Sequence, residues 1–319
     1  MNHNILYWYI IALINNISLF NCSALARMVP KVTHDQFTRF LKKELELQML
    51  IWQCIEHFPE IKKGYLLIDD SWLPKCVSNI FELVKIVYSG KFKRKMPGIT
   101  IVFVLWTDGN IRIPVGLRVW KKGGKTKPEL GLEMLSNLRN RKRLKPDYVV
   151  FDAHYATEKI LKLLDGYGWR YVCNIPKSRT LDGKAVKHHL MGGYGSVIGK
   201  AWYGGKVRVF REKSKFYLTN RLMLTREQVK EVYHYRVMIE EMFRLLKQEC
   251  GFVGCQMRNN LAYENHLNLC LINFMCLEHR RIQLLKQGKK VSIYKIRRQL
   301  YFTKGLFVPP LIKALFKTA

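Results

Sequence analysis

Two short apolar segments run directly into an aspartate, and this pattern restricts the fold more than any other feature of the chain. The first is YLLID at Tyr65–Asp69, and the second is YVVFD at Tyr148–Asp152. Short uninterrupted apolar runs of this kind are typical of strands that are buried on both faces. In an open α/β sheet, the groups just beyond such strand ends line the functional crevice. If the two strands are neighbours, both carboxylates reach one point; otherwise each aspartate only starts a turn.

Helical and extended patterns alternate around these two strands. Residues 1–60 read as helices, with Thr33 as a helix cap. The apolar runs on either side of Asp108-Gly109-Asn110 predict a hairpin, and Pro114 places its second strand at an edge or bulge. Further along, the patterns predict two helices and one strand: Pro128–Arg139, Ala156–Leu164 and Trp169–Ile175. This order predicts an α/β fold in which helices flank a mixed sheet.

The last third of the chain divides into an inserted segment, a long helix and a basic end. Residues 177–225 are rich in Gly and Lys and contain two β-like pieces. Thr225 and Gln228 form a capping-box pattern that predicts a long helix reaching about Glu249. We therefore predict three regions: a helical part at 1–60, an α/β domain at 61–282 that includes the inserted segment, and a basic tail at 283–319.

Charge is the unusual bulk property. Lys and Arg number 55 against 24 Asp and Glu, which gives a net charge of +31. A surplus of this size repels itself unless an anionic partner screens it, and nucleic acid is the commonest such partner. The alternative is a generally basic protein without a nucleic-acid partner.

Cysteine usage and the N-terminal segment indicate in which part of the cell the protein is expected. The eight cysteines contain no C-x-x-C pair, as expected for reduced thiols in a cytoplasmic protein. A zinc site from Cys250, Cys255 and His266 is an alternative with an unusual spacing. The apolar run Ile5–Ile14 is shorter than the ~20 residues that cross a bilayer and has no basic leader. It predicts a buried helix, with membrane association as the alternative.

Four functional side chains share one face of the long helix. Tyr233, Arg236, Glu240 and Lys247 are spaced 3, 4 and 7 apart, which places them within an arc of roughly 60°. Glu241 lies off this row. On geometry alone, the polar face of an ordinary amphipathic helix explains the same pattern.

The spacing Y-x2-R-x3-E-x6-K also resembles a known signature. It is similar to that of the Tyr-Arg-Glu-Lys (YREK) group of insertion-sequence transposases, a branch of the DDE transposases. YLLIDDSWLPK at 65–75 and VVFDAHYATEKIL at 149–161 resemble that group's two aspartate segments. VYSG at 87–90 and LWTDG at 105–109 are also similar. The resemblance extends from about residue 30 to 280.

The resemblance implies an RNase H-like fold with a β-rich insertion before the glutamate helix. It implies that Asp69, Asp152 and Glu240 are the catalytic residues and the ligands of two Mg²⁺ ions, with Mn²⁺ as a substitute. Asp70 is the alternative to Asp69, but strand alternation sends the two to opposite faces, so only one is a ligand. The same resemblance implies DNA contacts by three further residues: Tyr233, Arg236 and Lys247.

The insertion between Asp152 and Glu240 is small for this group. An aromatic side chain that clamps a DNA base is expected in this part of the chain. The sequence offers Trp169, Trp202 and Tyr203 without distinguishing among them.

The predicted function is cleavage of double-stranded DNA at terminal inverted repeats, followed by strand transfer into target DNA. Synapsis of two ends implies at least a homodimer, and the site of action is the cytoplasm at the nucleoid. Two alternatives remain: an RNase H-like nuclease without strand transfer, and a non-catalytic DNA-binding remnant of a transposase. Sequence patterns for a P-loop, a serine hydrolase, a zinc protease and a dinucleotide site are absent.

Overall fold

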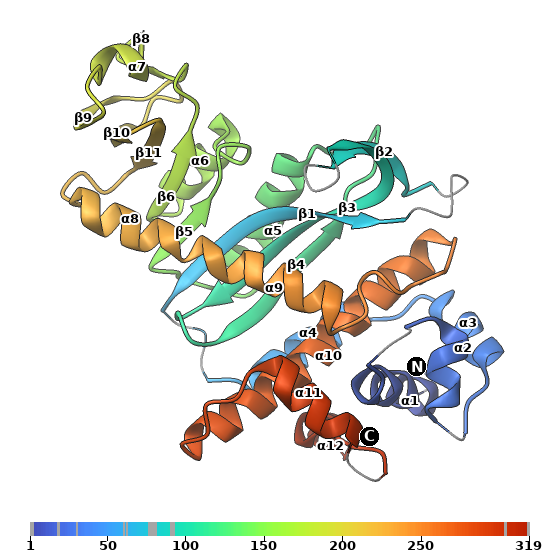
Figure 1. Ribbon diagram of the computed structural model, residues 1–319. Helices are drawn as coiled ribbons and strands as arrows, with labels where there is room; N and C mark the ends of the chain where they lie inside the picture. Colours follow the sequence, from blue (N-terminus) through green and yellow to red (C-terminus); the bar gives the residue numbers. More distant parts are fainter. Residues whose placement is uncertain are drawn as a thin grey trace. The chain divides into compact units, whose positions relative to one another are not determined.

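The computed structural model describes residues 3–17, 20–29, 31–59, 61, 63–75, 82–89, 93–302 and 305–317 (Figure 1). Gly90, the last residue of the VYSG segment, lies outside these ranges. Contacts divide the chain into two units. One comprises Met1–Glu60, Trp72–Ile101 and Glu241–Ala319, and the other comprises Ile61–Ser71 and Val102–Glu240. The predicted functional division at residues 60 and 282 stays a prediction.

The second unit is organised around parallel strands. β1 (Tyr65–Pro74) pairs in parallel with β5 (Tyr148–Phe151), and β5 pairs in parallel with β6 (Tyr171–Ile175). The side chains of Leu66, Leu67 and Ile68 are fully buried, because parallel strands are covered on both faces. The two short apolar runs are therefore neighbours in the sheet, as the sequence allowed.

A hairpin extends the sheet on the other side of β1. β3 (Arg94–Thr107) lies next to β1, and β4 (Arg112–Val119) pairs with β3. The Asp108 carboxylate accepts hydrogen bonds of 2.8 Å from the backbone N–H groups of Asn110 and Ile111, which closes the turn. In the described residues, β4 has β3 as its one partner, so Pro114 lies in an edge strand as predicted.

Helices pack against this sheet. α5 (Lys127–Asn140) contacts β4 and α6 (Glu158–Gly166), and α8 (Arg226–His234) contacts β5 and β6. The capping box of α5 pairs Thr126 with Glu129, and Thr157 caps α6. The mixed α/β architecture predicted from the element order is confirmed.

The inserted segment is β-rich and continues the same sheet. It contains a small pair of strands and a short helix: β7 (Thr180–Leu181), β8 (Lys184–Ala185) and α7 (Val186–His189). Three longer strands follow: β9 (Tyr194–Lys200), β10 (Lys206–Glu212) and β11 (Lys215–Thr219). β11 pairs antiparallel with β6. The insertion therefore lengthens the sheet that carries the aspartates.

The long helix predicted from Thr225 to about Glu249 is wrong in one respect, since it is two consecutive helices. α8 ends at His234, and α9 (Arg236–Gln248) begins two residues later. The ring of Tyr235 stacks on Tyr65 with centroids 3.8 Å apart. Hydrogen bonds from Tyr235 N to Val232 O and from Met238 N to Tyr235 O tighten the chain at this point.

The first unit is mainly helical. It holds β2 (Lys85–Ser89) and seven described helices: α1 (His3–Asn15), α2 (Cys22–Arg27), α3 (His34–Leu41), α4 (Leu47–Glu56), α10 (Asn260–Lys286), α11 (Ile293–Phe302) and α12 (Pro310–Lys317). α10 contacts α1, α3, α4, α11 and α12. The all-helical N-terminal part is confirmed.

Helix α1 is the buried helix that the N-terminal apolar run predicts. Its residues 9–14 are at most 1% exposed, and the hydroxyl of Tyr9 bonds His266 Nδ1 at 2.8 Å. No described helix is both long and apolar enough to cross a membrane. Arg297, counted with the basic tail, is 1% exposed and donates to Leu13 O, so it belongs to the core.

Candidate active site

Asp69 and Asp152 lie at neighbouring points of the sheet. The parallel register pairs Ile68 with Phe151, so the next residue on each strand is an aspartate. Asp152 directly follows β5, as predicted, and its carboxylate accepts a 2.9 Å bond from the backbone N–H of His154. Asp69 departs from the prediction because β1 continues to Pro74, which places this aspartate inside the strand.

The Asp69 carboxylate is largely buried and pairs with an arginine. Its side chain is 14% exposed, and its Oδ2 lies 2.5 Å from Nη2 of Arg236. Burial raises the pKa of Asp69 to about 6, with Arg236 opposing this rise and the nearby charge of Asp152 adding to it. The two aspartates therefore repel each other in a poorly solvated place, and a cation close to both would offset that repulsion.

Asp70 has a different set of partners from its neighbour. It accepts bonds from Lys127 Nζ at 2.7 Å and from the hydroxyl of Tyr155 at 3.2 Å. Burial and the charges of the neighbouring aspartates raise the pKa of Tyr155, so its hydroxyl stays protonated and donates to Asp70. The alternation of side chains along β1 thus directs Asp70 to α5 and Asp69 to α9.

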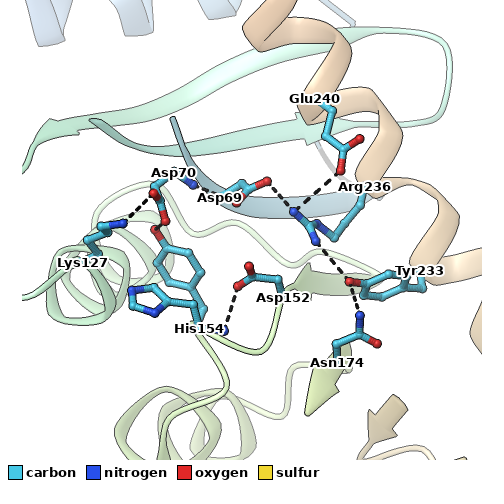
Figure 2. Close-up of polar contacts among 10 residues, drawn as sticks. Asp69, Asp70, Lys127, Asp152, His154, Asn174, Tyr233, Arg236 and Glu240 are labelled. Atoms are coloured by element: carbon cyan, nitrogen blue, oxygen red, sulfur yellow. Dashed lines mark hydrogen bonds and ion pairs between the residues drawn. The ribbon is translucent and has the colours of Figure 1, made fainter. Parts of the chain in front are cut away.

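Arg236 connects Tyr233 and Glu240 to Asp69 (Figure 2). Its Nη1 donates to the hydroxyl of Tyr233 at 3.1 Å, and its Nη2 lies 3.9 Å from Glu240 Oε1. Asn174 on β6 also donates to the Tyr233 hydroxyl, at 2.8 Å. Glu240 is the exposed member of the group, at 62%. The structure therefore links Tyr233, Arg236, Glu240 and Asp69 through one guanidinium.

Lys247 belongs to the other unit, seven residues after Glu240 on α9. Its contact with DNA stays a prediction. The buried face of α9 is formed by Ile239, Met242, Phe243 and Leu246.

The fit of a metal ion depends on where Arg236 lies. Among the described residues, no three His, Cys, Asp or Glu side chains are grouped closely enough to hold a metal ion. Within the predicted ligand set of three carboxylates, the guanidinium of Arg236 lies between Asp69 and Glu240. The donors are all carboxylates, which suit Mg²⁺, and Asp69 and Asp152 occupy adjacent strand positions. The donor chemistry of Asp69 and Asp152 therefore suits a divalent ion, and in the structure Arg236 already pairs with Asp69.

The zinc alternative receives no support in the described part of the chain. His266 is fully buried, and both of its ring nitrogens have partners, the hydroxyl of Tyr9 and the carbonyl of Gly251. Burial lowers the pKa of His266 to about 4. Cys250 and Cys255 are free and buried, and burial raises the pKa of each thiol.

Three residues of the site were missed in the sequence: Lys127, Tyr155 and Asn174. Asn174 carried a usable signal, because it is an amide within the otherwise apolar end of β6, VCNI. Lys127 and Tyr155 had none, since their contacts with Asp70 span 57 and 85 residues of sequence.

The candidate base-clamping aromatics are not equally accessible. Trp169 and Tyr203 are 4% and 5% exposed, and the Tyr203 hydroxyl donates to Asp165. Trp202 is half-buried, with the guanidinium of Arg179 over its ring at 4.7 Å. Of the three, Trp202 has the most accessible ring.

Comparison with protein families shows to which family the chain belongs. A family model described as "Transposase DDE domain" matches residues 99–276, which is more than half of the chain. The chain belongs to this family. The matched part of the transposase includes Asp152 and Glu240, whereas Asp69 lies before it. Comparison with curated protein sequences finds no match.

A solved structure resembles the transposase in fold. The piggyBac transposase synaptic complex with hairpin DNA aligns with a TM-score of 0.57 at 13% identity, over 100% of this chain and 73% of that chain. This likeness agrees with the RNase H-like fold predicted from the sequence. The NurA nuclease from Sulfolobus solfataricus aligns with a TM-score of 0.27 at 11% identity, over 79% of this chain and 93% of that chain. That alignment is too loose to bear on the fold.

Proposed function

We propose that this transposase cleaves DNA at the ends of its element and joins the freed ends to target DNA. In this proposal Asp69, Asp152 and Glu240 hold two Mg²⁺ ions, for which Mn²⁺ substitutes. The observation that carries the proposal is the register of β1 and β5, which sets Asp69 and Asp152 side by side. Glu240 stands one helical turn from Arg236, the residue that pairs with Asp69.

Each side chain has a role that follows from its surroundings. When bound, divalent ions would supply charge neutralisation for the attacking and leaving oxygens of a phosphoryl transfer. Asp69 and Asp152 are held by the sheet and fix the position of the scissile phosphate relative to β1 and β5. Glu240 is on an exposed helix face and completes the set after Arg236 moves. Arg236, freed from Asp69, binds a DNA phosphate through two N–H groups.

The proposed partner is double-stranded DNA, both the terminal inverted repeats and the target. A net charge of +31 supports a polyanionic partner. The Tyr-Arg-Glu-Lys spacing supports assignment to that group of transposases, with Tyr233 and Lys247 as further DNA contacts. Pairing of two ends requires at least a homodimer. Trp202 is the proposed aromatic that stacks on a displaced base, because its ring is the accessible one of the three candidates.

Cleavage of a plasmid that carries the flanking repeats tests the proposal. Asp152→Asn and Glu240→Gln should each lower the Mg²⁺-dependent cleavage rate at least about a hundredfold, because several kcal/mol of transition-state stabilisation depend on the ions. DNA binding, measured by fluorescence anisotropy, should stay within a few fold of wild type. Glu231→Gln is the matched control, because Glu231 is an exposed acid on α8.

Three outcomes decide among the functions. Loss of cleavage in both site variants, with the control unchanged and joined products in the wild type, supports the transposase. Cleaved but never joined DNA indicates a nuclease. Normal cleavage by both variants contradicts the site.

A further inference from the structure

A polar pocket lies at the opposite end of the central strands from the candidate active site. Its volume is about 360 Å³, and its lining includes three cationic residues and two aromatic residues: Arg139, Lys145, Arg170, Tyr167 and Trp169. Asp147 is the one carboxylate in the lining. All of these residues belong to the same unit as Asp69 and Asp152. We call this feature the α5–β5 pocket.

The sheet explains why these residues meet. Arg139 lies in the last turn of α5, and Lys145 lies in the loop that leads into β5. Arg170 directly precedes β6. Because β5 and β6 are parallel, with Val149 opposite Tyr171, the segments that enter them lie side by side. The pocket is thus at the amino ends of these strands, about 13 Å of strand from the carboxyl end at Asp152.

The three cations of the pocket have no acidic partner of their own. In the described part of the chain, Arg139, Lys145 and Arg170 form no ion pair with any carboxylate. Arg139 instead lies 5.9 Å from the centre of the Tyr167 ring, a contact that leaves its N–H groups available. Unpaired cations gathered in a pocket repel one another, so the place is favourable for an anion.

In the loop beside the pocket, an arginine adopts a backbone conformation that favours glycine. Arg143 has φ 53°, and its N–H bonds the carbonyl of Arg139 at 3.1 Å. Leu144 N bonds Leu138 O at 3.1 Å, which completes a helix-ending motif whose left-handed position is usually Gly. Arg143 is exposed, as are two further cations, Arg141 and Lys142. The basic surface therefore extends along the loop, beyond the space that one phosphate fills.

Trp169 gives the pocket an apolar wall with an unsatisfied donor. The side chain is 4% exposed, and its indole N–H has no hydrogen-bond acceptor in the described structure. Buried polar groups normally have partners. A ligand rich in acceptor oxygens is the kind that fits beside it.

We propose that the α5–β5 pocket binds a phosphodiester of the DNA backbone, at a point remote from the bond that is cut. The choice of DNA as the source of the phosphate rests on the proposed function. A duplex held at both ends of β5 would be fixed in direction as well as position, because one contact alone allows it to pivot.

The salt dependence of DNA binding tests the pocket directly. Lys145→Gln/Arg170→Gln removes two cations from the pocket. Lys159→Gln/Lys162→Gln is the matched control, because both lysines are exposed on α6 in ion pairs of 3.3 and 2.6 Å with glutamates. Affinity for a short random-sequence duplex is measured by anisotropy at several KCl concentrations without divalent metal. The slope of log K against log salt should lose about 0.9 for each phosphate contact removed, in the pocket variant alone.

Chemical labelling of the wild-type protein supplies a readout that needs no substitution. Lys145 and Lys162 are both exposed to an amine-reactive reagent. Saturating duplex should protect Lys145 and leave Lys162 reactive, as quantified by mass spectrometry.

The proposal is overturned if both double variants show the same salt slope, if Lys145 stays reactive, or if the wild type does not bind DNA. None of these measurements involves cleavage. A transposase that binds through the pocket but fails to cut therefore contradicts the proposed function and leaves the pocket intact.

Discussion

Removal of the Arg236 side-chain charge should strengthen metal binding, although it removes a residue of the candidate site. In the structure Arg236 pairs with Asp69 through a 2.5 Å contact, and the two side chains are only 16% and 14% exposed. A hydrogen bond to a charged group contributes about 1.5–3 kcal/mol. A divalent ion that binds Asp69 must first displace this interaction. Arg236→Gln should therefore tighten Mn²⁺ binding by about ten- to a hundredfold, since each 1.4 kcal/mol is a factor of ten.

Mn²⁺ binding without DNA is measured by the electron paramagnetic resonance signal of the free ion. The assay is run at pH 8, above the wild-type Asp69 pKa of about 6, because protons compete with the ion at lower pH. Arg244→Gln is the control, because Arg244 is an exposed arginine on the same helix and its removal changes the net charge equally. Both variants reduce the general repulsion of cations, but only Arg236→Gln frees Asp69.

DNA should reproduce the effect in the wild-type protein. A backbone phosphate that attracts Arg236 releases Asp69, so duplex DNA should tighten Mn²⁺ binding to the wild type more than to Arg236→Gln. Linkage requires Mn²⁺ to strengthen DNA binding by the same factor. Equal Mn²⁺ affinities in wild type, Arg236→Gln and Arg244→Gln would refute the displacement argument.

Three further predictions concern stability. Asp70→Asn should lower the free energy of unfolding in urea by about 1 kcal/mol, because its 2.7 Å pair with Lys127 is partly exposed. His266 has a pKa of about 4 in the folded state against about 6.5 unfolded, so the unfolded chain takes up the proton first. Stability should therefore fall as the pH drops from about 6.5 to 4, by up to about 1.4 kcal/mol per pH unit. Gly98→Ala should cost about 2 kcal/mol or more in the same urea assay, because its Cβ would lie 2.6 Å from the carbonyl oxygen of Leu73.

Each of these predictions has a control. Asp70→Asn should leave cleavage within a few fold of wild type, whereas Asp69→Asn should abolish it; equal loss would mean that Asp70 is also a ligand. His266→Gln should flatten the acid part of the stability profile, and an unchanged slope would assign it to other groups. Gly166→Ala, at a helical position with open space around the added Cβ, should not destabilise.

The parts of the fold that the sequence predicted are those set by local chemistry. The β5 strand was found because four consecutive apolar residues precede Asp152. The start of α8 was found because Thr225 begins a capping box, and α5 was found close to its start because Pro128 suits a first helical turn. These signals lie within a few residues of the feature that they define, so one chain is enough to read them.

The features that the sequence did not predict depend on distant partners. β1 continues through the polar residues Asp70 and Ser71, next to β3 in the sheet. The helix interruption at Tyr235 coincides with its stacking on Tyr65. The pairing of Asp69 with Arg236 joins residues 167 positions apart. No local pattern encodes such contacts, although the signature spacing selected Arg236 as functional and the YLLID segment selected Asp69.

The pairing of β11 with β6 has a practical consequence for anyone who shortens this protein. Excision of the inserted segment would remove the strand that covers one side of β6 and leave a row of backbone donors and acceptors without partners. The shortened protein would expose an unpaired edge of β6. This strand lies next to β5, which leads to Asp152. We therefore expect the shortened protein to self-associate through the exposed edge of β6 before any change in its chemistry can be measured.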